Sequence, residues 1–283
     1  MTVDIPKVLL NDGQEMPMIG LGTIALVGNK GKLEIMDAIK SGYRLIDTST
    51  NYNNEGIVGR AVRESGVSRD ELIISSKLPG EYQGYERALK IIEEQLARTG
   101  LEYFDKYLIH WPNPDDGKYV EAWKGLIHAQ ELGLVRTIGV SNFLEHHLEK
   151  IIDETGVVPA TNQIEIHPYF HNEENVEANK KFGIQTEAWS PFGREINDVI
   201  ENPEILEIGK KYNKSAPQVI LRWLYQRDIL SVPRSTNRLH QKENLNIFDF
   251  ELTEDEMEKI FAFDKGEEGR VEDQNPDEYH EYV

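Results

Sequence analysis

The sequence predicts a single (β/α)8 barrel, and three observations support this fold class. Short β-rich segments alternate with segments of helical periodicity along the 283 residues, a pattern typical of a parallel sheet covered by helices. Each unit of strand, helix and terminating glycine takes about 25–30 residues, as expected for a (β/α) repeat. The number of β-rich segments favours a closed barrel over an open doubly wound sheet. We therefore treat residues 1–283 as one domain.

The first expected element is a β-hairpin at residues 7–17. Its centre, Asn11-Asp12-Gly13, lies between apolar flanks and is a strong signal for a tight hairpin turn. Because the hairpin precedes the first barrel strand, we expect it to cap the bottom of the barrel.

The expected barrel strands are short runs rich in β-branched and aromatic residues, bounded by glycine, proline or polar clusters. They span residues 18–23, 44–48, 72–78, 105–111, 135–142, 160–166, 184–190 and 229–233.

The expected helices show apolar residues at helical spacing between these strands. In residues 85–100, Ala88, Ile91, Ile92 and Leu96 fall on one face, and Gly100 ends the pattern. The other helix candidates span residues 33–42, 118–133, 143–156, 203–212 and 215–227. The last two both lie in the long interval before the final strand.

Composition excludes several classes of function. The chain has no cysteine, so disulfides, thiolate metal sites and thiol nucleophiles are excluded. A formal charge of −19 repels phosphate backbones, which argues against a nucleic-acid partner. The sequence shows neither a signal peptide nor an apolar stretch of membrane-spanning length. We expect a cytoplasmic monomer whose partner is a small molecule.

Acidic residues concentrate near the end of the chain, at residues 251–258 and 267–282. Charge runs of this kind usually form solvated surface, so we expect a solvated helix face and a loose tail. The alternative is a tail that folds over the mouth of the active site.

Four residues of complementary chemistry fall at or just after the ends of three consecutive strands: Asp47, Tyr52, Lys77 and His110. Barrel enzymes place their chemistry at this end, so we expect these side chains to converge. A phenol with a pKa of about 10 is a poor acid near neutrality, and a lysine beside it favours the phenolate. We assign Tyr52 as general acid, Lys77 as its tuner, Asp47 as the partner of Lys77, and His110 as the group that orients a carbonyl. This is the acid half of a carbonyl reduction.

Two other hypotheses remain open from these residues. Glu165, His167 and Glu187 could hold a metal in a barrel isomerase or hydrolase, although no HExxH motif supports this. A non-catalytic, cofactor-binding subunit is the third hypothesis, and the complete set of four catalytic residues argues against it. We expect no metal site.

Eight segments in order resemble the aldo-keto reductases: GLGT, LIDTSTNYNNE, ISSKL, YLIHWP, GVSNF, NQIEIHP, AWSPF and VPRSTNRLHQKEN. The resemblance covers the whole chain, and within the family it is similar to bacterial diketogluconate and glyoxal or methylglyoxal reductases. It implies a (β/α)8 barrel that binds NADPH without a Rossmann fold and reduces aldehydes and ketones. The family's catalytic Asp, Tyr, Lys and His fall on Asp47, Tyr52, Lys77 and His110.

The same resemblance implies a cofactor site at the strand ends. Ser141, Asn142 and Gln163 match the residues that hold the nicotinamide carboxamide, and Trp189 matches the aromatic residue that stacks on the ring. The remaining cofactor candidates are Thr23, Ser190, Pro191, Phe192, Gly193, Arg234, Ser235, Thr236, Asn237, His240, Glu243 and Asn244.

Two departures from the family pattern bear on the 2′-phosphate of the cofactor. Arg234 replaces the usual lysine and can bind a phosphate in a bidentate way. His240 replaces the usual arginine, with Arg238 two residues earlier. We therefore expect NADPH to be preferred, with some use of NADH.

The substrate site is less defined by the sequence. Trp111 is expected to form a wall, with Leu26, Tyr82 and Trp189 as weaker wall candidates. Ile24 stands where the family often has a tryptophan, which opens or reshapes the site. These residues indicate a small to medium aldehyde or ketone, and the acidic surface makes anionic sugar acids less attractive than neutral carbonyls.

Overall fold

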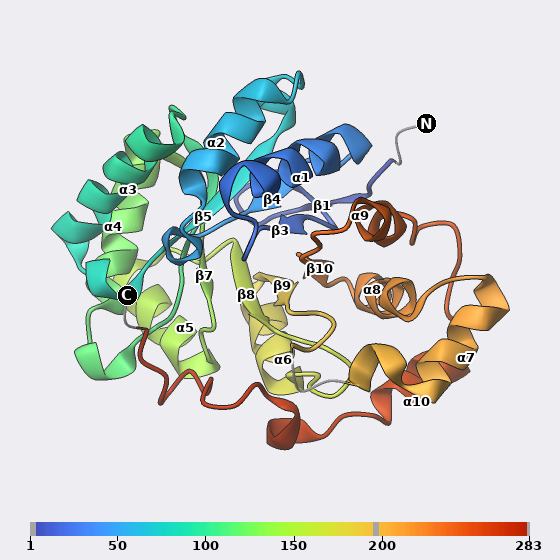
Figure 1. Ribbon diagram of the computed structural model, residues 1–283. Coiled ribbons are helices and arrows are strands. Elements are labelled where there is room, and N and C mark those ends of the chain that lie inside the picture. The colour runs from blue at the N-terminus through green and yellow to red at the C-terminus, as the bar shows by residue number, and fades with distance from the viewer. Residues whose placement is uncertain (1–3, 195–197, 282–283) are drawn as a thin grey trace.

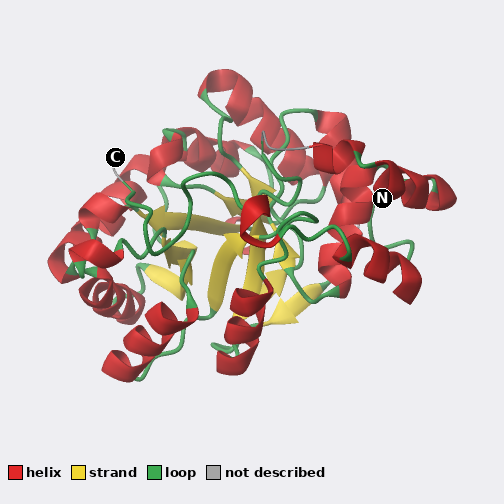
Figure 2. Ribbon diagram, turned by 90° about the horizontal axis from the view of Figure 1, so that it is seen from below, coloured by secondary structure: helices red, strands yellow, loops and turns green. Residues whose placement is uncertain are grey.

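The structure, a computed structural model, describes residues 4–194 and 198–281. Eight parallel strands form its central sheet, surrounded by helices (Figures 1 and 2). The strand order along the sheet follows the chain, from β3 to β10. The two edges meet, because Gly20 N donates to Ser231 O at 2.9 Å and Gly22 N donates to Pro233 O at 3.1 Å. These bonds close the sheet and confirm the predicted (β/α)8 barrel.

Every predicted barrel strand is present, and most of their side chains are buried, as expected for parallel strands covered on both faces. The strands are β3 (Leu21–Gly22), β4 (Leu45–Asp47), β5 (Ile73–Leu78), β6 (Phe104–Ile109), β7 (Val135–Ser141), β8 (Thr161–Glu165), β9 (Gln185–Trp189) and β10 (Leu230–Ser231).

All of the predicted helices are also present, and further helices occupy segments where none was predicted. They are α1 (Gly28–Ser41), α2 (Glu55–Glu64), α3 (Tyr85–Thr99), α4 (Tyr119–Glu131), α5 (Glu145–Thr155), α6 (Glu173–Phe182), α7 (Pro203–Tyr212), α8 (Ala216–Gln226), α9 (Arg238–Leu245) and α10 (Glu254–Phe261). Short 3-10 turns follow several strands at the active-site end, among them η1 (Thr50–Tyr52) and η3 (Gly80–Tyr82).

The predicted start of α1 was wrong by one turn and more. The expected helix began at residue 33, whereas α1 begins at Gly28. The glycines of this first turn do not break the helix. A Cβ on Gly31 would lie 2.9 Å from the carbonyl oxygen of Leu26, so the close approach of the helix to the preceding loop requires glycine there.

The N-terminal hairpin caps the bottom of the barrel, as predicted. Its strands β1 (Lys7–Leu9) and β2 (Glu15–Pro17) pair in antiparallel fashion around a turn in which Gly13 has a φ of 83°. Leu10 and Met16 pack against Leu45 and Leu230, which lie at the beginnings of β4 and β10. The apolar contact seals the end of the barrel opposite the active site.

The C-terminal tail crosses the active-site end of the barrel, so the expectation of a loose tail was wrong and the alternative holds. In Figure 1 the dark red segment leaves α10 and runs across to the side of α3 and α4. Val271 N donates to the Glu165 side chain at 3.0 Å, and the ring of Tyr279 lies 4.2 Å from that of Trp111. The other acidic run does form a helix, α10, whose acidic side chains are mostly exposed.

The described residues, 4–194 and 198–281, contain no helix with the length and apolar character needed to cross a bilayer.

Candidate active site

The four predicted catalytic residues meet at the carboxyl end of the barrel. Lys77 Nζ donates to Asp47 Oδ2 at 2.6 Å and to the Thr48 carbonyl at 3.1 Å, and both charged side chains are buried. The same ammonium lies 5.2 Å from the centre of the Tyr52 ring. The rings of Tyr52 and His110 meet edge to face, with centroids 6.4 Å apart. A phenol, an ammonium, a carboxylate and an imidazole therefore lie together, and we call these four residues the catalytic group.

Strand register explains why these side chains face the same side. Asp47 on β4 pairs with Ser75 on β5, and Lys77 stands two residues beyond Ser75. Side chains two apart on a strand share a face, so Asp47 and Lys77 project together. Lys77 pairs in turn with Leu108 on β6, and His110 stands two residues beyond Leu108.

Burial and charge act against each other on both titrating groups. For Lys77, burial acts to lower the pKa, but the charges of Asp47 and Tyr52 outweigh it, and the pKa is raised. For Tyr52, burial raises the pKa by more than Lys77 lowers it. The sequence predicted the direction of the Lys77 effect but not the net result, which keeps the phenol protonated near neutral pH.

A chain of buried polar side chains extends from this group across the barrel interior. Gln163 Nε2 donates to Glu187 Oε1 at 2.7 Å and to Asp47 Oδ1 at 3.3 Å. Glu187 in turn forms an ion pair with Lys106, and both of these side chains are fully buried. We call Lys77, Asp47, Gln163, Glu187 and Lys106 the interior network. The presence of Lys106 in this network was not predicted.

The residues proposed for a metal do not come together. Glu187 belongs to the interior network, whereas Glu165 and His167 contact each other at 3.1 Å. Glu165 also accepts from Val271 N of the tail. Each acid therefore already has its own partners, and the metal hypothesis is not favoured.

The residues expected at the nicotinamide carboxamide line the rim beside His110. Ser141 Oγ donates to the Gln163 carbonyl at 2.7 Å, and Asn142 Nδ2 donates to the His110 carbonyl at 3.0 Å. Trp189 Nε1 donates to Asn142 Oδ1 at 2.8 Å. Gln163 uses both amide hydrogens within the interior network, which leaves its Oε1 for the N–H of a ligand amide.

The loop after β9 turns sharply behind Trp189. Ser190 has a φ of 48°, and Gly193 N donates to the Ser190 carbonyl at 2.8 Å. The Arg194 side chain donates to Ser190 Oγ and places its guanidinium 5.0 Å from the centre of the Trp189 ring. Arg194 was not predicted. Pro191 and Phe192 lie within the turn, where Pro191 is buried and Phe192 packs against the core.

The amino end of α9 has the character of a phosphate site. Asn237 caps this helix, because its Oδ1 accepts from Leu239 N at 2.9 Å, and Ser235 Oγ accepts from Asn237 N at 3.1 Å. Arg234 and His240 are exposed beside this terminus. A helix amino end with nearby cations favours an anion. Of the other candidates here, Thr236 and Glu243 are exposed and Asn244 is buried.

Thr23 supports the catalytic strand ends instead of facing open space. Its hydroxyl donates to the Asp47 carbonyl at 2.9 Å, and Asn54 Nδ2 donates to the Thr23 carbonyl at 2.7 Å. The side chain of Thr23 is fully buried. These contacts hold the ends of β3 and β4 together.

The predicted substrate residues separate into two groups. Trp111 lies beside His110 with its ring against Tyr279, and Gln83 donates to its carbonyl at 2.6 Å. Ile24 is 41% exposed on the loop after β3. Leu26, by contrast, is fully buried in the core, so its assignment to the wall was wrong.

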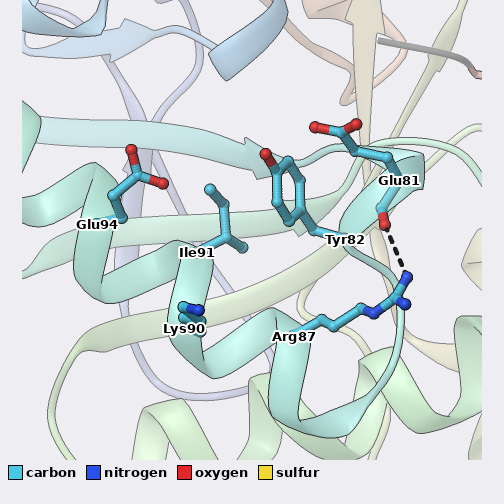
Figure 3. Close-up of a pocket in the computed structure, with 6 residues that line it drawn as sticks. All are labelled: Glu81, Tyr82, Arg87, Lys90, Ile91 and Glu94. Atoms are coloured by element: carbon cyan, nitrogen blue, oxygen red, sulfur yellow. Dashed lines mark hydrogen bonds between the residues drawn. The ribbon is translucent and has the colours of Figure 1, made fainter.

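The assignment of Tyr82 to the wall was also wrong. Figure 3 shows its ring over α3, beside Ile91 and Glu94, in a separate hollow. The Arg87 side chain donates to the Glu81 carbonyl at the other side of this hollow. The 3-10 turn η3 directs Tyr82 outward, a feature that side-chain type could not indicate.

Sequence reasoning also missed an acidic side chain that lies against the catalytic group. The Glu281 carboxylate, in the tail, lies 2.5 Å from His110 Nδ1. Its acidic type within a charge run gave no indication of this position, because the contact depends on how the tail folds back.

Comparison with known proteins identifies the family of this chain. Residues 18–265 match the model of the Aldo/keto reductase family. The chain is 45% identical to 2,5-diketo-D-gluconic acid reductase B of Corynebacterium sp. (strain SHS752001), covering 98% of this chain and 99% of that protein. It is 44% identical to glyoxal reductase of Bacillus subtilis (strain 168), covering 96% of each.

Solved structures resemble the fold over nearly its full length. An aldo/keto reductase from Brucella melitensis is 40% identical with a TM-score of 0.88, covering 92% of this chain and 100% of that chain. An aldo-keto reductase from Bombyx mori in complex with NADP is 33% identical with a TM-score of 0.89, covering 96% of each chain.

Proposed function

The chain belongs to the aldo/keto reductase family, and from this premise we propose that it reduces small to medium neutral aldehydes and ketones. It is an oxidoreductase that uses NADPH to convert a carbonyl into an alcohol. The observation that carries the assignment of the reacting residues is the buried Lys77–Asp47 ion pair beside Tyr52 and His110.

Each residue of this group has a distinct role in the proposed mechanism. NADPH, when bound, supplies the hydride to the carbonyl carbon. Tyr52 donates its proton to the carbonyl oxygen, and His110 holds that oxygen in place. Lys77 stabilises the phenolate that Tyr52 becomes, and Asp47 keeps Lys77 charged and oriented.

The cofactor candidates fit the chemistry of NADPH at both ends. Gln163 Oε1 and the Ser141–Asn142 pair offer hydrogen bonds to a primary amide. Arg234 and the amino end of α9 offer positive charge to a 2′-phosphate, and the exposed His240 ring lies beside them. NADPH is therefore proposed to be preferred over NADH.

The proposed substrate class rests on the names of two relatives and on the acidic surface. One relative is named a glyoxal reductase and another a 2,5-diketo-D-gluconic acid reductase, and both names describe dicarbonyl compounds. The charge of −19 favours the neutral dicarbonyl over the anionic sugar acid. We further propose that the protein is a monomer, which size-exclusion chromatography would test. We also propose that it works in the cytoplasm, which fractionation of cells would test.

A screen of NADPH oxidation tests the reaction. Methylglyoxal, benzaldehydes, keto esters and aldoses are offered in turn, and each assay is repeated with NADH. We expect turnover of neutral carbonyls at a higher kcat/KM with NADPH. The absence of NADPH oxidation with every neutral carbonyl would contradict the proposed function.

A tyrosine variant tests the proton donor. Tyr52→Phe removes the hydroxyl and is expected to lower kcat by about 100-fold or more, the usual contribution of a general acid, while fluorescence titration shows NADPH binding retained. Tyr82→Phe is the matched control, because Tyr82 lies in the separate hollow on α3, and should leave kcat unchanged. Full turnover by Tyr52→Phe would remove the assignment.

A further inference from the structure

A carboxylate from the end of the chain enters the catalytic group. The Glu281 side chain is 3% exposed, although it follows an acidic and mostly solvated run. One of its oxygens lies 2.5 Å from His110 Nδ1 and accepts from Asn51 Nδ2. The other accepts from Gly80 N at 2.7 Å. Two hydrogen-bond donors and the His110 ring, from three separate strand-end loops, therefore converge on one carboxylate.

The backbone around this carboxylate is fixed in both directions. Asn113 Nδ2 donates to the Glu281 carbonyl at 3.3 Å, and Glu281 N donates to Asn113 Oδ1 at 3.2 Å. A Cβ on Gly80 would lie 2.7 Å from the Glu281 carbonyl oxygen. The tail can approach this closely only because residue 80 is glycine. The contact is therefore a close-packed one.

The tail is anchored on both sides of the catalytic end. Asp277 Oδ1 lies 3.0 Å from His146 Nε2 and 3.3 Å from His147 Nε2. Because Leu144 N donates to His147 Nδ1, the proton of the neutral His147 ring is on Nε2, which faces Asp277. Tyr279 then packs its ring on Trp111. These contacts position the tail so that Glu281 lies beside His110.

We propose that Glu281 is a specificity-determining residue that disfavours substrates with a carboxylate next to the reacting carbonyl. The inference rests on the proposed function, in which His110 holds the carbonyl oxygen. A carboxylate on the neighbouring substrate carbon would then lie within a few ångströms of the Glu281 carboxylate, in a buried site where charges are poorly screened.

The nearby charged groups do not cancel the repulsion between Glu281 and a substrate carboxylate. The Lys77 charge is balanced by Asp47. Two of the partners of Glu281, the Gly80 N–H and the Asn51 amide, are neutral donors that bind a carboxylate without cancelling its charge. Arg194 over Trp189 is exposed, so water screens its attraction for an anion.

A matched pair of substrates tests the proposal. Phenylglyoxylate and its methyl ester present the same ketone with and without a negative charge beside it. In Glu281→Gln, the ratio of kcat/KM for the acid to that for the ester should rise by about tenfold or more, the effect of removing one poorly screened charge. Glu278→Gln, which removes the same charge from an exposed tail position, should leave the ratio unchanged. An unchanged ratio in Glu281→Gln, or an equal rise in both variants, would overturn the proposal.

A binding measurement keeps the test independent of turnover. Mandelate and mandelamide, the charged and neutral forms of one α-hydroxy compound, are titrated by quenching of tryptophan fluorescence. Glu281→Gln should tighten mandelate about tenfold relative to mandelamide, and equal changes for both would count against the role of Glu281. If the wild type turns over neither the ester nor the other neutral carbonyls, the proposed function fails, while this binding result still decides the effect of Glu281.

Discussion

At the scale of single residues, the pKa of Tyr52 depends on the balance of two opposing effects. Burial raises its pKa, Lys77 lowers it, and burial has the larger effect. A proton donor that is protonated near neutral pH is what reduction of a carbonyl requires. In the proposed mechanism, Lys77 contributes by stabilising the phenolate that forms during the reaction, because its buried positive charge lies nearby.

The amino end of α9 gives a prediction about cofactor choice. His240→Arg adds a permanent charge and a bidentate donor beside the proposed 2′-phosphate site. The ratio of kcat/KM for NADPH to that for NADH should rise by about tenfold, the value of one charge-assisted hydrogen bond. Leu239→Arg is the control, because it adds the same charge at the neighbouring exposed position. A rise of equal size in the control would show a general charge effect instead of a specific contact.

The grouping of the proposed catalytic residues could be predicted from the sequence, whereas their supporting partners could not. Asp47, Lys77 and His110 end or follow consecutive strands, so the fold class alone brings them together. Lys106 lies in the middle of strand β6, and Glu281 lies in the acidic tail. Their partners are distant in sequence, and only the folded barrel places them.

At the scale of elements, periodicity predicted some helices well and missed others. Helix α3 buries Ile91, Ile92 and Leu96 on one face and was predicted within a residue of its end. Helix α6 buries Asn175, Ala178 and Asn179 instead. A helix that packs polar side chains onto the barrel has no apolar stripe, so the sequence pattern could not reveal it.

The packing of α2 against α3 gives a prediction about stability. A Cβ on Gly59 would lie 2.6 Å from the Thr99 carbonyl carbon, so Gly59→Ala forces the two helices apart. We expect the free energy of unfolding to fall by about 1–3 kcal/mol, as for other overpacked sites. Urea denaturation followed by circular dichroism measures this change.

Gly56→Ala provides the control within the same helix. A Cβ there would lie 3.7 Å from the Arg98 carbonyl oxygen, which is an ordinary contact. Alanine is the better helix former, so this variant should gain about 0.5 kcal/mol. Loss of stability in both variants would show that α2 tolerates no added side chain, and the specific contact with Thr99 would not be the cause.

At the scale of the whole molecule, the two ends of the barrel differ. The hairpin closes the amino end with apolar side chains, and the catalytic group and tail occupy the carboxyl end. The barrel and the hairpin cap were predictable because each depends on local pattern. The path of the tail depends on contacts with loops more than 100 residues away in the sequence, such as that between Glu281 and Asn113.

Buried tyrosines predict how stability depends on alkaline pH. Burial raises the pKa of Tyr43 and Tyr107, so both stay protonated in the folded chain. In the unfolded chain they release protons near pH 10, so the stability they confer is present below pH 10 and falls as pH rises further. Tyr43→Phe removes one of these groups, and its free energy of unfolding should therefore decline less steeply than that of the wild type between about pH 10 and 11.5.

Urea titrations at several alkaline pH values measure these slopes. Tyr85→Phe is the control, because Tyr85 lies at the partly exposed start of α3. Identical slopes for the wild type and Tyr43→Phe would show that the buried phenol is not responsible. The hydrogen bond from Tyr43 to the Gln241 carbonyl is also lost in the variant, which lowers stability at every pH without changing the slope.

The interior network has a consequence for how this barrel diverges over time. Lys106 and Glu187 are fully buried. Replacing one alone leaves the other as an unpaired charge in the protein interior, which solvates ions poorly. A simultaneous exchange of both for apolar side chains of similar volume avoids that penalty. Descendants of this gene should therefore keep both residues or lose both together, and lineages that carry one without the other should be rare.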